Sequence, residues 1–302
     1  MRIFITGGTG FIGRHTVREL LRRGHRVLVL SLRKKDAEIF SLAQNPRLAF
    51  ISGNLAAPRQ WIPRVKKFKP EAAIHLAWEG IPKDEAELNM RNAMNGLECI
   101  RAMANVGCKT VLVAGSCHEY GEPGMQVNED SPLRPFNGLY GAKVALYWLG
   151  SKLAAERGMK LIWMRFGFVY GPGQRSGSLI PHLIRSIEKG ETPILKNPNG
   201  GNDFVYVGDV ARAIAQITKK RAKLSSGAYN VGSGELTGVW EIVKLTYALR
   251  KKIVPREIRR KHGGKISGFW MDISKIRRET RWRPQTKIQD GIRKTLEYLI
   301  SQ

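Results

Sequence analysis

The chain has 302 residues, 42% of them hydrophobic and 25% charged, which is enough to bury a large core and excludes disordered and collagen-like proteins. Its 51 Lys and Arg residues outweigh 25 Asp and Glu residues, which gives a net charge of +26. No RNA- or DNA-binding module accompanies this charge, so we interpret it as a basic solvated surface and expect no nucleic-acid partner; a nucleic-acid or membrane patch, with the basic C-terminal segment as the nucleic-acid candidate, is the alternative. No window approaches about 18 uncharged apolar residues, and the strand-like run from Arg2 leaves no room for a signal peptide, so we expect a cytoplasmic protein without a membrane span.

The first thirty residues predict a strand, a glycine turn, a helix and a second strand. An apolar run at residues 3–5 is followed by Gly7, Gly10 and Gly13, then by apolar residues at helical spacing, and then by a second apolar run at 27–30. Glycines at such a turn let backbone N–H groups approach a pyrophosphate at the N-terminus of the helix. Because the strand before and the helix after the glycines are both present, the pattern indicates a dinucleotide-binding turn.

Apolar strands and helices alternate along the rest of the chain. The pattern predicts strands at residues 50–51, 72–77, 111–114 and 161–165, and helices at 89–106 and 140–157. Continuous apolar strands between helices are typical of a parallel α/β sheet covered on both faces. After residue 173 we expect a helix at 179–189, a strand at 203–207, a helix at 210–218, a strand at 229–231, a helical stretch from Glu235, a basic irregular stretch and a final helix at 288–299.

The cysteines give no sign of a disulfide framework or a metal site. Cys99, Cys108 and Cys117 form no CxxC pair and lie in apolar or strand-like contexts, so we expect reduced thiols. Cys117 and His118 have no further ligands at suitable spacing, and no metal is predicted.

Six segments along the chain resemble one protein family. TGGTGFIG at residues 6–13 is similar to the glycine turn of the extended short-chain dehydrogenase/reductase family, which contains nucleotide-sugar epimerases, dehydratases and ketoreductases. The other segments are HLAW at 75–78, GSCHEYG at 115–121, RFGFVYGPG at 165–173, DFVYVGDV at 203–210 and YNVG at 229–232. The resemblance implies a Rossmann domain with a doubly wound parallel sheet, residues 1–171 and 203–233, and a smaller C-terminal substrate-binding lobe, residues 172–202 and 234–302.

The end of the second strand bears on the choice of dinucleotide. An acidic residue there would bind the 2′-hydroxyl of the adenosine ribose and favour NAD. This chain has Ser31, Arg33 and Lys34 instead. Because a hydroxyl group and two cations suit a 2′-phosphate, we predict NADP as the cofactor, with NAD as the second choice. The alternative is that these residues form only a solvated basic loop. The resemblance implies further cofactor-binding residues: Gly7, Gly10, Phe11, Ile12, Gly13, Asn54, Leu55, Leu76, Ala77, Trp78, Tyr140, Lys143 and Phe166.

A serine, a tyrosine and a lysine carry the chemistry of similar proteins. The resemblance implies that Ser116 orients the substrate carbonyl, that the tyrosine exchanges a proton with the substrate oxygen, and that Lys143 lowers the pKa of the phenol and binds the nicotinamide ribose. The family spacing is YxxxK, whereas Tyr140 precedes Lys143 by only three residues, and an ungapped alignment puts Leu139 in the place of the tyrosine.

Residues three and four apart both share a helix face, so we expect Tyr140 to be the proton donor within hydrogen-bond reach of Ser116 or of the substrate oxygen. An altered site, or a role for Tyr120, is the alternative.

Departures from the family pattern narrow the reaction. The 4,6-dehydratases carry an Asp-Glu pair where this chain has Cys117 and His118, so we do not expect dehydration. Where similar proteins have a diphosphate-binding asparagine and an arginine, this chain has Phe168 and Asn202, and both changes remove polar contacts to a nucleotide diphosphate. The residues that could replace these contacts are Arg175, Arg259, Arg260 and His262. The expected substrate-binding residues are Trp78, Ser116, Cys117, His118, Phe168, Arg175 and Asn202.

These features together favour an NADP(H)-dependent reductase of a 4-keto-sugar nucleotide. A nucleotide-sugar C4 epimerase is the runner-up, and a non-catalytic NADP-binding sensor or regulator is the alternative of another class. The helices at 89–106 and 140–157 pair subunits into a four-helix dimer in similar proteins, so the resemblance implies a homodimer.

Overall fold

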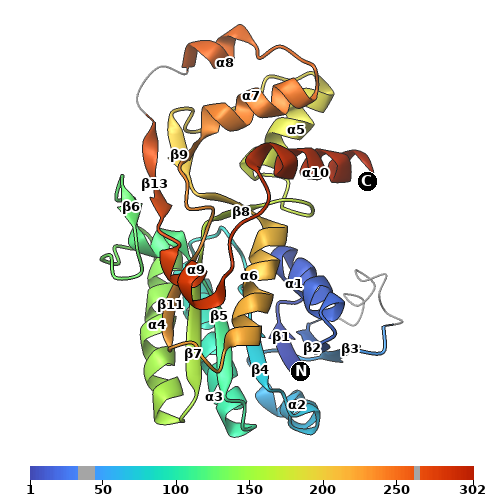
Figure 1. Cartoon of the computed structure of the whole chain (residues 1–302), viewed down its shortest axis with the longest axis vertical. Coiled ribbons are helices and arrows are strands. Elements are labelled where there is room, and N and C mark those ends of the chain that lie inside the picture. The colour runs from blue at the N-terminus through green and yellow to red at the C-terminus, as the bar shows by residue number, and fades with distance from the viewer. Residues whose placement is uncertain (33–44, 262–265) are drawn as a thin grey trace.

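The computed structural model describes residues 1–32, 45–261 and 266–302. Its larger part is a seven-stranded sheet with helices on both faces (Figure 1). The strand order is β11-β7-β5-β4-β1-β2-β3, and every pairing is parallel. The strands are β1 (Arg2–Thr6), β2 (Arg26–Ser31), β3 (Leu48–Ser52), β4 (Ala72–His75), β5 (Thr110–Ser116), β7 (Lys160–Phe166) and β11 (Gly227–Val231). The predicted Rossmann-type α/β class is confirmed.

Two helix layers cover the sheet because its strands are apolar on both sides. In β1, Ile3 and Ile5 pack in the core beneath α1 (Phe11–Arg22) and α6 (Val207–Lys220), whereas Phe4 faces the other core. That second core lies under α3 (Ala86–Asn105) and α4 (Gly138–Glu156), with α2 (Ile62–Phe68) beside them. Parallel strands end at one edge of a sheet, so the loops after β1, β4 and β5 meet there, where ligands of such sheets bind.

A smaller lobe lies beyond that carboxyl edge, at the upper end of Figure 1. Its apolar core joins α5 (Leu179–Lys189), α7 (Val239–Leu249) and α10 (Ile288–Ile300). The short strands β8 (Phe168–Tyr170) and β10 (Phe204–Tyr206) pair in parallel at its base. A four-stranded sheet has the order β12-β9-β13-β6, with β6 (Gln126–Val127), β9 (Gly200–Asn202), β12 (Thr237–Gly238) and β13 (Ser267–Met271).

The segment after residue 235 differs from the sequence prediction. The helix begins only at Val239, because Thr237 and Gly238 pair antiparallel with β9. The stretch expected to be irregular contains α8 (Arg256–Lys261), β13 and α9 (Ser274–Thr280). β13 pairs with β9 and β6, which are distant in the sequence, so local periodicity could not indicate it. The boundaries of the two lobes stay a prediction.

The buried core contains all three cysteines as free thiols. Burial raises the pKa of Cys99 to about 12, and it also raises the pKa of Cys108 and Cys117, so none is a thiolate at neutral pH. In the described part of the chain, no helix is long and apolar enough to cross a membrane, and no group of His, Cys, Asp and Glu side chains is arranged to hold a metal ion.

Candidate active site

The turn between β1 and α1 depends on three glycines. Gly7 has φ +70°, and a Cβ there would lie 2.5 Å from the Ala77 nitrogen. A Cβ at Gly13 would lie 2.0 Å from the Gly7 oxygen, whereas one at Gly10 would meet only that same oxygen, at 3.3 Å. Gly10 caps α1 without a side-chain hydrogen bond, and no acidic residue lies in the first turn. The first N–H groups of α1 are therefore available to an anion such as a pyrophosphate.

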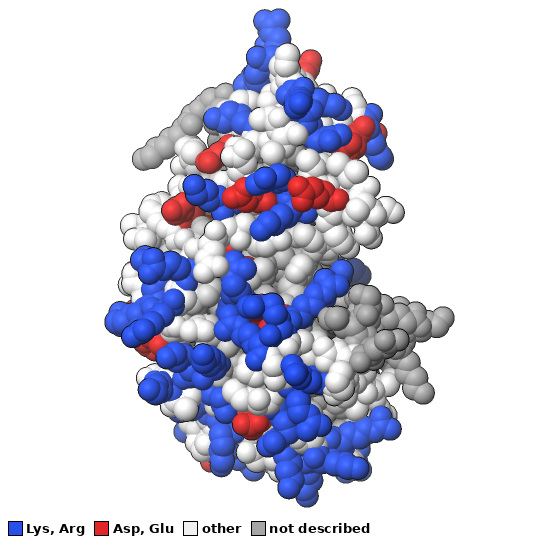
Figure 2. Space-filling view, turned by 45° about the vertical axis from the view of Figure 1, so that its right-hand side comes forward, with Lys and Arg blue, Asp and Glu red and all other residues white. Residues whose placement is uncertain are grey.

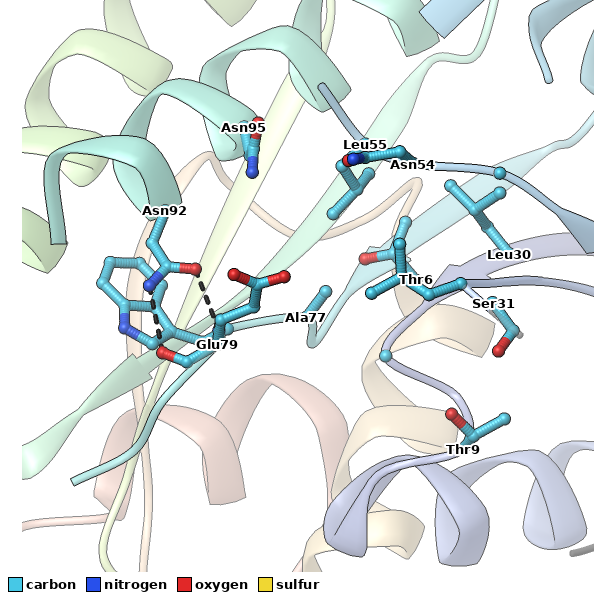
Figure 3. Close-up of a pocket in the computed structure, with 14 residues that line it drawn as sticks. Thr6, Thr9, Leu30, Ser31, Asn54, Leu55, Ala77, Glu79, Asn92 and Asn95 are labelled. Atoms are coloured by element: carbon cyan, nitrogen blue, oxygen red, sulfur yellow. Dashed lines mark hydrogen bonds between the residues drawn. The ribbon is translucent and has the colours of Figure 1, made fainter. Parts of the chain in front are cut away.

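A pocket opens beside this turn, at the carboxyl ends of the central strands (Figure 3). Asn92 reaches from α3 and fixes the loop after β4: its Oδ1 accepts from the Glu79 N–H at 2.9 Å, and its Nδ2 donates to the Glu79 oxygen at 3.1 Å. The lining residues are Thr6, Gly7, Thr9, Leu30, Ser31, Leu32, Gly53, Asn54, Leu55, Ala77, Trp78, Glu79, Asn92 and Asn95.

Six of the predicted cofactor residues come together in this pocket: Gly7, Ser31, Asn54, Leu55, Ala77 and Trp78. Phe11 and Ile12 begin α1, Leu76 follows β4, and Phe166 closes β7, so they lie at the same edge of the sheet. Arg33 and Lys34 lie outside the described residues. Sequence reasoning missed the other lining residues: Thr6, Thr9, Leu30, Leu32, Gly53, Glu79, Asn92 and Asn95. The only signal for the two asparagines was a polar pair three residues apart on one helix.

Ser116 is the last residue of β5, and Lys143 reaches that end of the strand from α4. The Ser116 Oγ accepts from the His118 N–H at 3.2 Å. The Lys143 side chain is buried, donates from Nζ to the Ala114 oxygen at 3.0 Å, and lies 3.9 Å from the centre of the Trp78 ring. Burial lowers the pKa of Lys143 to about 8, against the opposing effect of the Glu119 charge. Lys143 is thus a cation whose charge is sensitive to its surroundings.

Tyr140, rather than Leu139, faces the loop that follows Ser116. Asn137 caps α4 by accepting from the Tyr140 N–H at 3.1 Å, and the Tyr140 ring lies 4.7 Å from the His118 ring. Leu139 is buried, and its N–H donates to Asp84 at 2.7 Å. Burial raises the pKa of Tyr140 to about 12. Among the described residues no hydrogen bond joins Tyr140 to Ser116, so the role of Tyr140 stays a prediction.

Four aromatic rings gather around the ring of His118. We call His118, Phe136, Tyr140, Phe168 and Phe269 the aromatic cluster; the ring centres of the last four lie 5.2, 4.7, 4.9 and 6.1 Å from that of His118. Burial lowers the pKa of His118 to about 4, and its Nδ1 is buried without a hydrogen-bond partner in the described part of the protein. His118 is therefore neutral at pH 7 and offers one unused polar atom.

Some of the other predicted substrate residues lie near the aromatic cluster, and others lie far from it. The positive charge of Arg175 acts on Tyr140, so this arginine lies near the aromatic cluster, with its Nε bonded to Ser178 at 3.2 Å. Asn202 pairs with Phe269 between β9 and β13. Arg259 and Arg260 lie on α8, far from β5 in Figure 1, and His262 lies outside the described residues.

A buried polar network supports the Ser116 loop from below. Glu119 is 0% exposed and accepts from the Ser116 N–H at 2.7 Å, from Trp163 at 2.9 Å and from Arg165 at 2.8 Å. Arg165 also donates to Tyr120, whose hydroxyl donates to Asn230 at 2.7 Å. Tyr120 is 1% exposed and held in this network, which argues against the alternative that it takes the role of the proton donor. Sequence reasoning missed Glu119 and Arg165, although a glutamate and an arginine inside apolar segments are a signal for buried pairing.

Comparisons with known proteins agree with this geometry. Residues 3–232 match the NAD dependent epimerase/dehydratase family. The chain is 26% identical over 317 residues to an uncharacterized UDP-glucose epimerase, YtcB, of Bacillus subtilis, covering 100% of this chain and 98% of that one. It is 25% identical to the dTDP-6-deoxy-L-talose 4-dehydrogenase (NAD(+)) of Aggregatibacter actinomycetemcomitans, covering 78% and 85%. The solved UDP-glucose 4-epimerase of Thermus thermophilus, in complex with NAD, is similar with a TM-score of 0.82 and 26% identity over 99% of each chain.

Proposed function

We propose, from the chain's membership of the NAD-dependent epimerase/dehydratase family, that it is a nucleotide-sugar C4 epimerase. Members of this family act on nucleotide sugars. The observation that carries the proposal is the aromatic cluster beside Ser116. A C4 epimerase must let its keto-sugar intermediate turn, so that either face can be reduced. Rings hold a sugar by apolar contact, which is non-directional, whereas a wall of hydrogen-bonding side chains would fix one orientation. The relatives named as UDP-glucose epimerases support this choice over the reductase that the sequence favoured.

The residues at the site fit a nicotinamide dinucleotide. The Gly7–Gly10–Gly13 turn and the uncapped start of α1 would hold the pyrophosphate, and the pocket at Asn54 and Leu55 would hold the adenosine. When bound, the dinucleotide supplies the two-electron oxidation and reduction at C4. Tyr140 would take the proton from the C4 hydroxyl and return it, and Ser116 would hydrogen-bond the same oxygen. The charge of Lys143 would lower the pKa of the phenol.

Dehydration is not supported by the groups that follow Ser116. Cys117 is 1% exposed and burial raises the pKa of its thiol, while His118 is neutral at pH 7. An elimination needs an acid and a base at these positions, but burial makes the Cys117 thiol a weaker acid and the His118 imidazole a weaker base.

The assay that tests the proposal is conversion of UDP-glucose to UDP-galactose by the purified protein with catalytic NAD. We expect the two epimers to equilibrate with no net change in absorbance at 340 nm, because each turnover returns the cofactor to its starting state. No conversion of any UDP- or dTDP-sugar despite tight dinucleotide binding would instead point to the non-catalytic sensor.

The second candidate is an NADP-dependent 4-keto-sugar reductase. It is favoured by Ser31, which lines the pocket at the end of β2, where an NAD-selecting acidic residue would stand. This candidate requires NADPH to bind at least about tenfold more tightly than NADH, a difference of ~1.4 kcal/mol, and to be consumed by a 4-keto sugar nucleotide. Equal affinities, or tighter binding of NADH, would favour the epimerase.

The glycine turn gives a prediction about binding. Gly10→Val is expected to abolish NADH binding and largely retain the fold, because a Cβ there meets only the Gly7 oxygen, at 3.3 Å, and the side chain fills the space of the pyrophosphate. Fluorescence titration measures the binding, and circular dichroism the fold. Gly13→Val is the contrasting variant, expected to destabilise the protein itself because its Cβ would lie 2.0 Å from the Gly7 oxygen. Retention of NADH affinity in Gly10→Val would show that the phosphate turn is misplaced.

We also propose a homodimer through α3 and α4, as the family resemblance implied. These adjacent helices expose large apolar side chains: Met90 is 66%, Met94 64%, Trp148 64% and Leu149 58% exposed. Trp148→Glu is expected to yield monomers in analytical ultracentrifugation, because a charge cannot be buried unpaired at the interface. Ile194→Glu, at an even more exposed apolar residue of the other lobe, is the control and should leave the dimer intact. Dimers that persist in Trp148→Glu would place the interface elsewhere.

A further inference from the structure

A second concave surface lies at the end of the sheet opposite the active site. It is lined by residues at the amino ends of β1, β4, β5 and β7 and at the carboxyl ends of α2, α3 and α6. This basic groove has a volume of about 750 Å³, which is within the range of small-ligand sites. The dinucleotide pocket lies at the carboxyl ends of the same sheet, so the two sites are separated by the length of the strands.

The groove is far more basic than the protein as a whole. Across the chain, 51 Lys and Arg residues stand against 25 Asp and Glu residues, about two to one. In the described part of the chain, the groove is lined by one carboxylate, Glu71, and by six cations: Arg2, Lys66, Lys69, Lys109, Lys160 and Arg221. Lys and Arg also gather over the lower end of the molecule in Figure 2, with few acidic residues among them. The groove is thus a local concentration of charge and not a sample of the average surface.

Three cations form a fixed floor. Arg2 Nε donates to the Lys69 oxygen at 2.7 Å, and Lys160 Nζ donates to the oxygens of Ala222 and Leu224 at 2.8 and 2.9 Å. Arg221 donates to the Thr218 oxygen at 3.3 Å. These partners are neutral carbonyls, so they hold the cationic groups in place without cancelling their charge.

Glu71 is the single counter-charge of the floor. It lies 3.9 Å from both Arg2 and Arg221. The hydrogen bond from the Arg2 N–H, and then the charges of Arg2 and Arg221, hold the pKa of the Glu71 carboxyl below its ordinary value. One carboxylate cannot neutralise its cationic neighbours, so the groove retains a positive potential.

The rim consists of three exposed lysines, Lys66, Lys69 and Lys109, none of which forms an ion pair with any residue that the structure describes. Among the residues that the structure describes, no aromatic side chain lines the groove, so this lining lacks the rings on which nucleobases stack. Its recognition chemistry is that of phosphate groups alone, which Lys and Arg bind by charge-assisted hydrogen bonds.

We propose that the basic groove binds a compact polyphosphate, either inorganic or the triphosphate of a nucleotide. Because the groove lies at the opposite end of the sheet from the glycine turn, the ligand does not compete with the dinucleotide. The proposal does not depend on which sugar nucleotide the active site takes.

Isothermal titration of the full chain with sodium tripolyphosphate, in about 0.1 M salt and with saturating NADH, tests the proposal. The rim variant Lys66→Gln/Lys69→Gln/Lys109→Gln is expected to bind at least about tenfold more weakly than the unaltered protein. The control variant Lys189→Gln/Lys196→Gln/Lys244→Gln removes the same charge from exposed lysines of the other lobe and should bind within about twofold of the unaltered protein.

A parallel titration with ATP distinguishes the two sources of phosphate. If ATP and tripolyphosphate bind with equal affinity, the ligand is inorganic polyphosphate. If ATP binds much more tightly than tripolyphosphate, the ligand is a nucleotide. Absence of binding both with and without NADH, equal weakening in the rim and control variants, or binding that is found without NADH and lost at saturating NADH would each overturn the proposal.

Discussion

Tyr140→Phe is expected to lower turnover by about 10²–10⁴-fold and to leave NADH affinity within about twofold, because the variant loses only the hydroxyl to which we assign the proton exchange with the substrate. The measurement is the rate of C4 interconversion together with a fluorescence titration of NADH. Tyr147→Phe is the matched control on the same helix; its ring packs against Trp163 and Trp148, and its turnover should not change.

The physical basis of this prediction is the start of α4. Asn137 begins the helix so that Tyr140 lies in its first turn, three residues before Lys143. Leu139 is 2% exposed and lies in the protein interior, while Tyr140 packs against His118 in the aromatic cluster. We therefore expect the start of α4 to compensate for the residue that the YxxxK spacing lacks. Near-normal turnover in Tyr140→Phe would show that another group handles the proton.

Glu119→Ala is expected to lower the free energy of unfolding by about 3–5 kcal/mol. The substitution leaves Arg165, which is 2% exposed, as a buried cation without its carboxylate, and it also removes the acceptor of the Ser116 and Trp163 N–H groups. Urea denaturation followed by circular dichroism measures the change.

An exposed ion pair provides the control for this second prediction. Glu98 pairs with Arg101 at 2.9 Å, but their side chains are 31% and 51% exposed, so Glu98→Ala should cost no more than about 1 kcal/mol. The double variant Glu119→Leu/Arg165→Met is expected to lose less stability than Glu119→Ala, because it removes both charges together. A loss in Glu119→Ala as small as that in Glu98→Ala would mean that the buried pair contributes little.

The local patterns of the chain were sufficient to predict most of the parallel sheet. The apolar run of β1, the glycines of the turn and the spacing in α1 all lie within twenty-two residues, so the sequence indicates them directly. The strands β12 and β13 were missed because their pairing with β9 joins distant parts of the chain. Asn92 was missed for a similar reason, since its importance lies in bonds to the loop after β4.

The support beneath the active site depends on strand register. Gly115 pairs with Arg165 between β5 and β7, and this register brings the arginine to Glu119. A Cβ at Gly115 would lie 2.6 Å from the Glu119 carboxylate and 2.2 Å from Trp163 Nε1, so the glycine makes room for the network. The sequence showed Ser116 as a candidate, but not the carboxylate that holds its backbone. The sequence also ranked the reductase first, from Ser31 and its basic neighbours, whereas the aromatic cluster and the relatives favour the epimerase.

The central claim is that Tyr140, Ser116 and Lys143 act together on the C4 oxygen of a nucleotide sugar. A crystal structure of the protein with NAD and UDP-glucose tests it most directly. We predict that the Tyr140 hydroxyl and the Ser116 Oγ both lie about 2.6–3.2 Å from the C4 oxygen, with Lys143 turned from Ala114 toward the nicotinamide ribose. Leu139 facing the nicotinamide, with Tyr140 pointing away from the sugar, would contradict the claim.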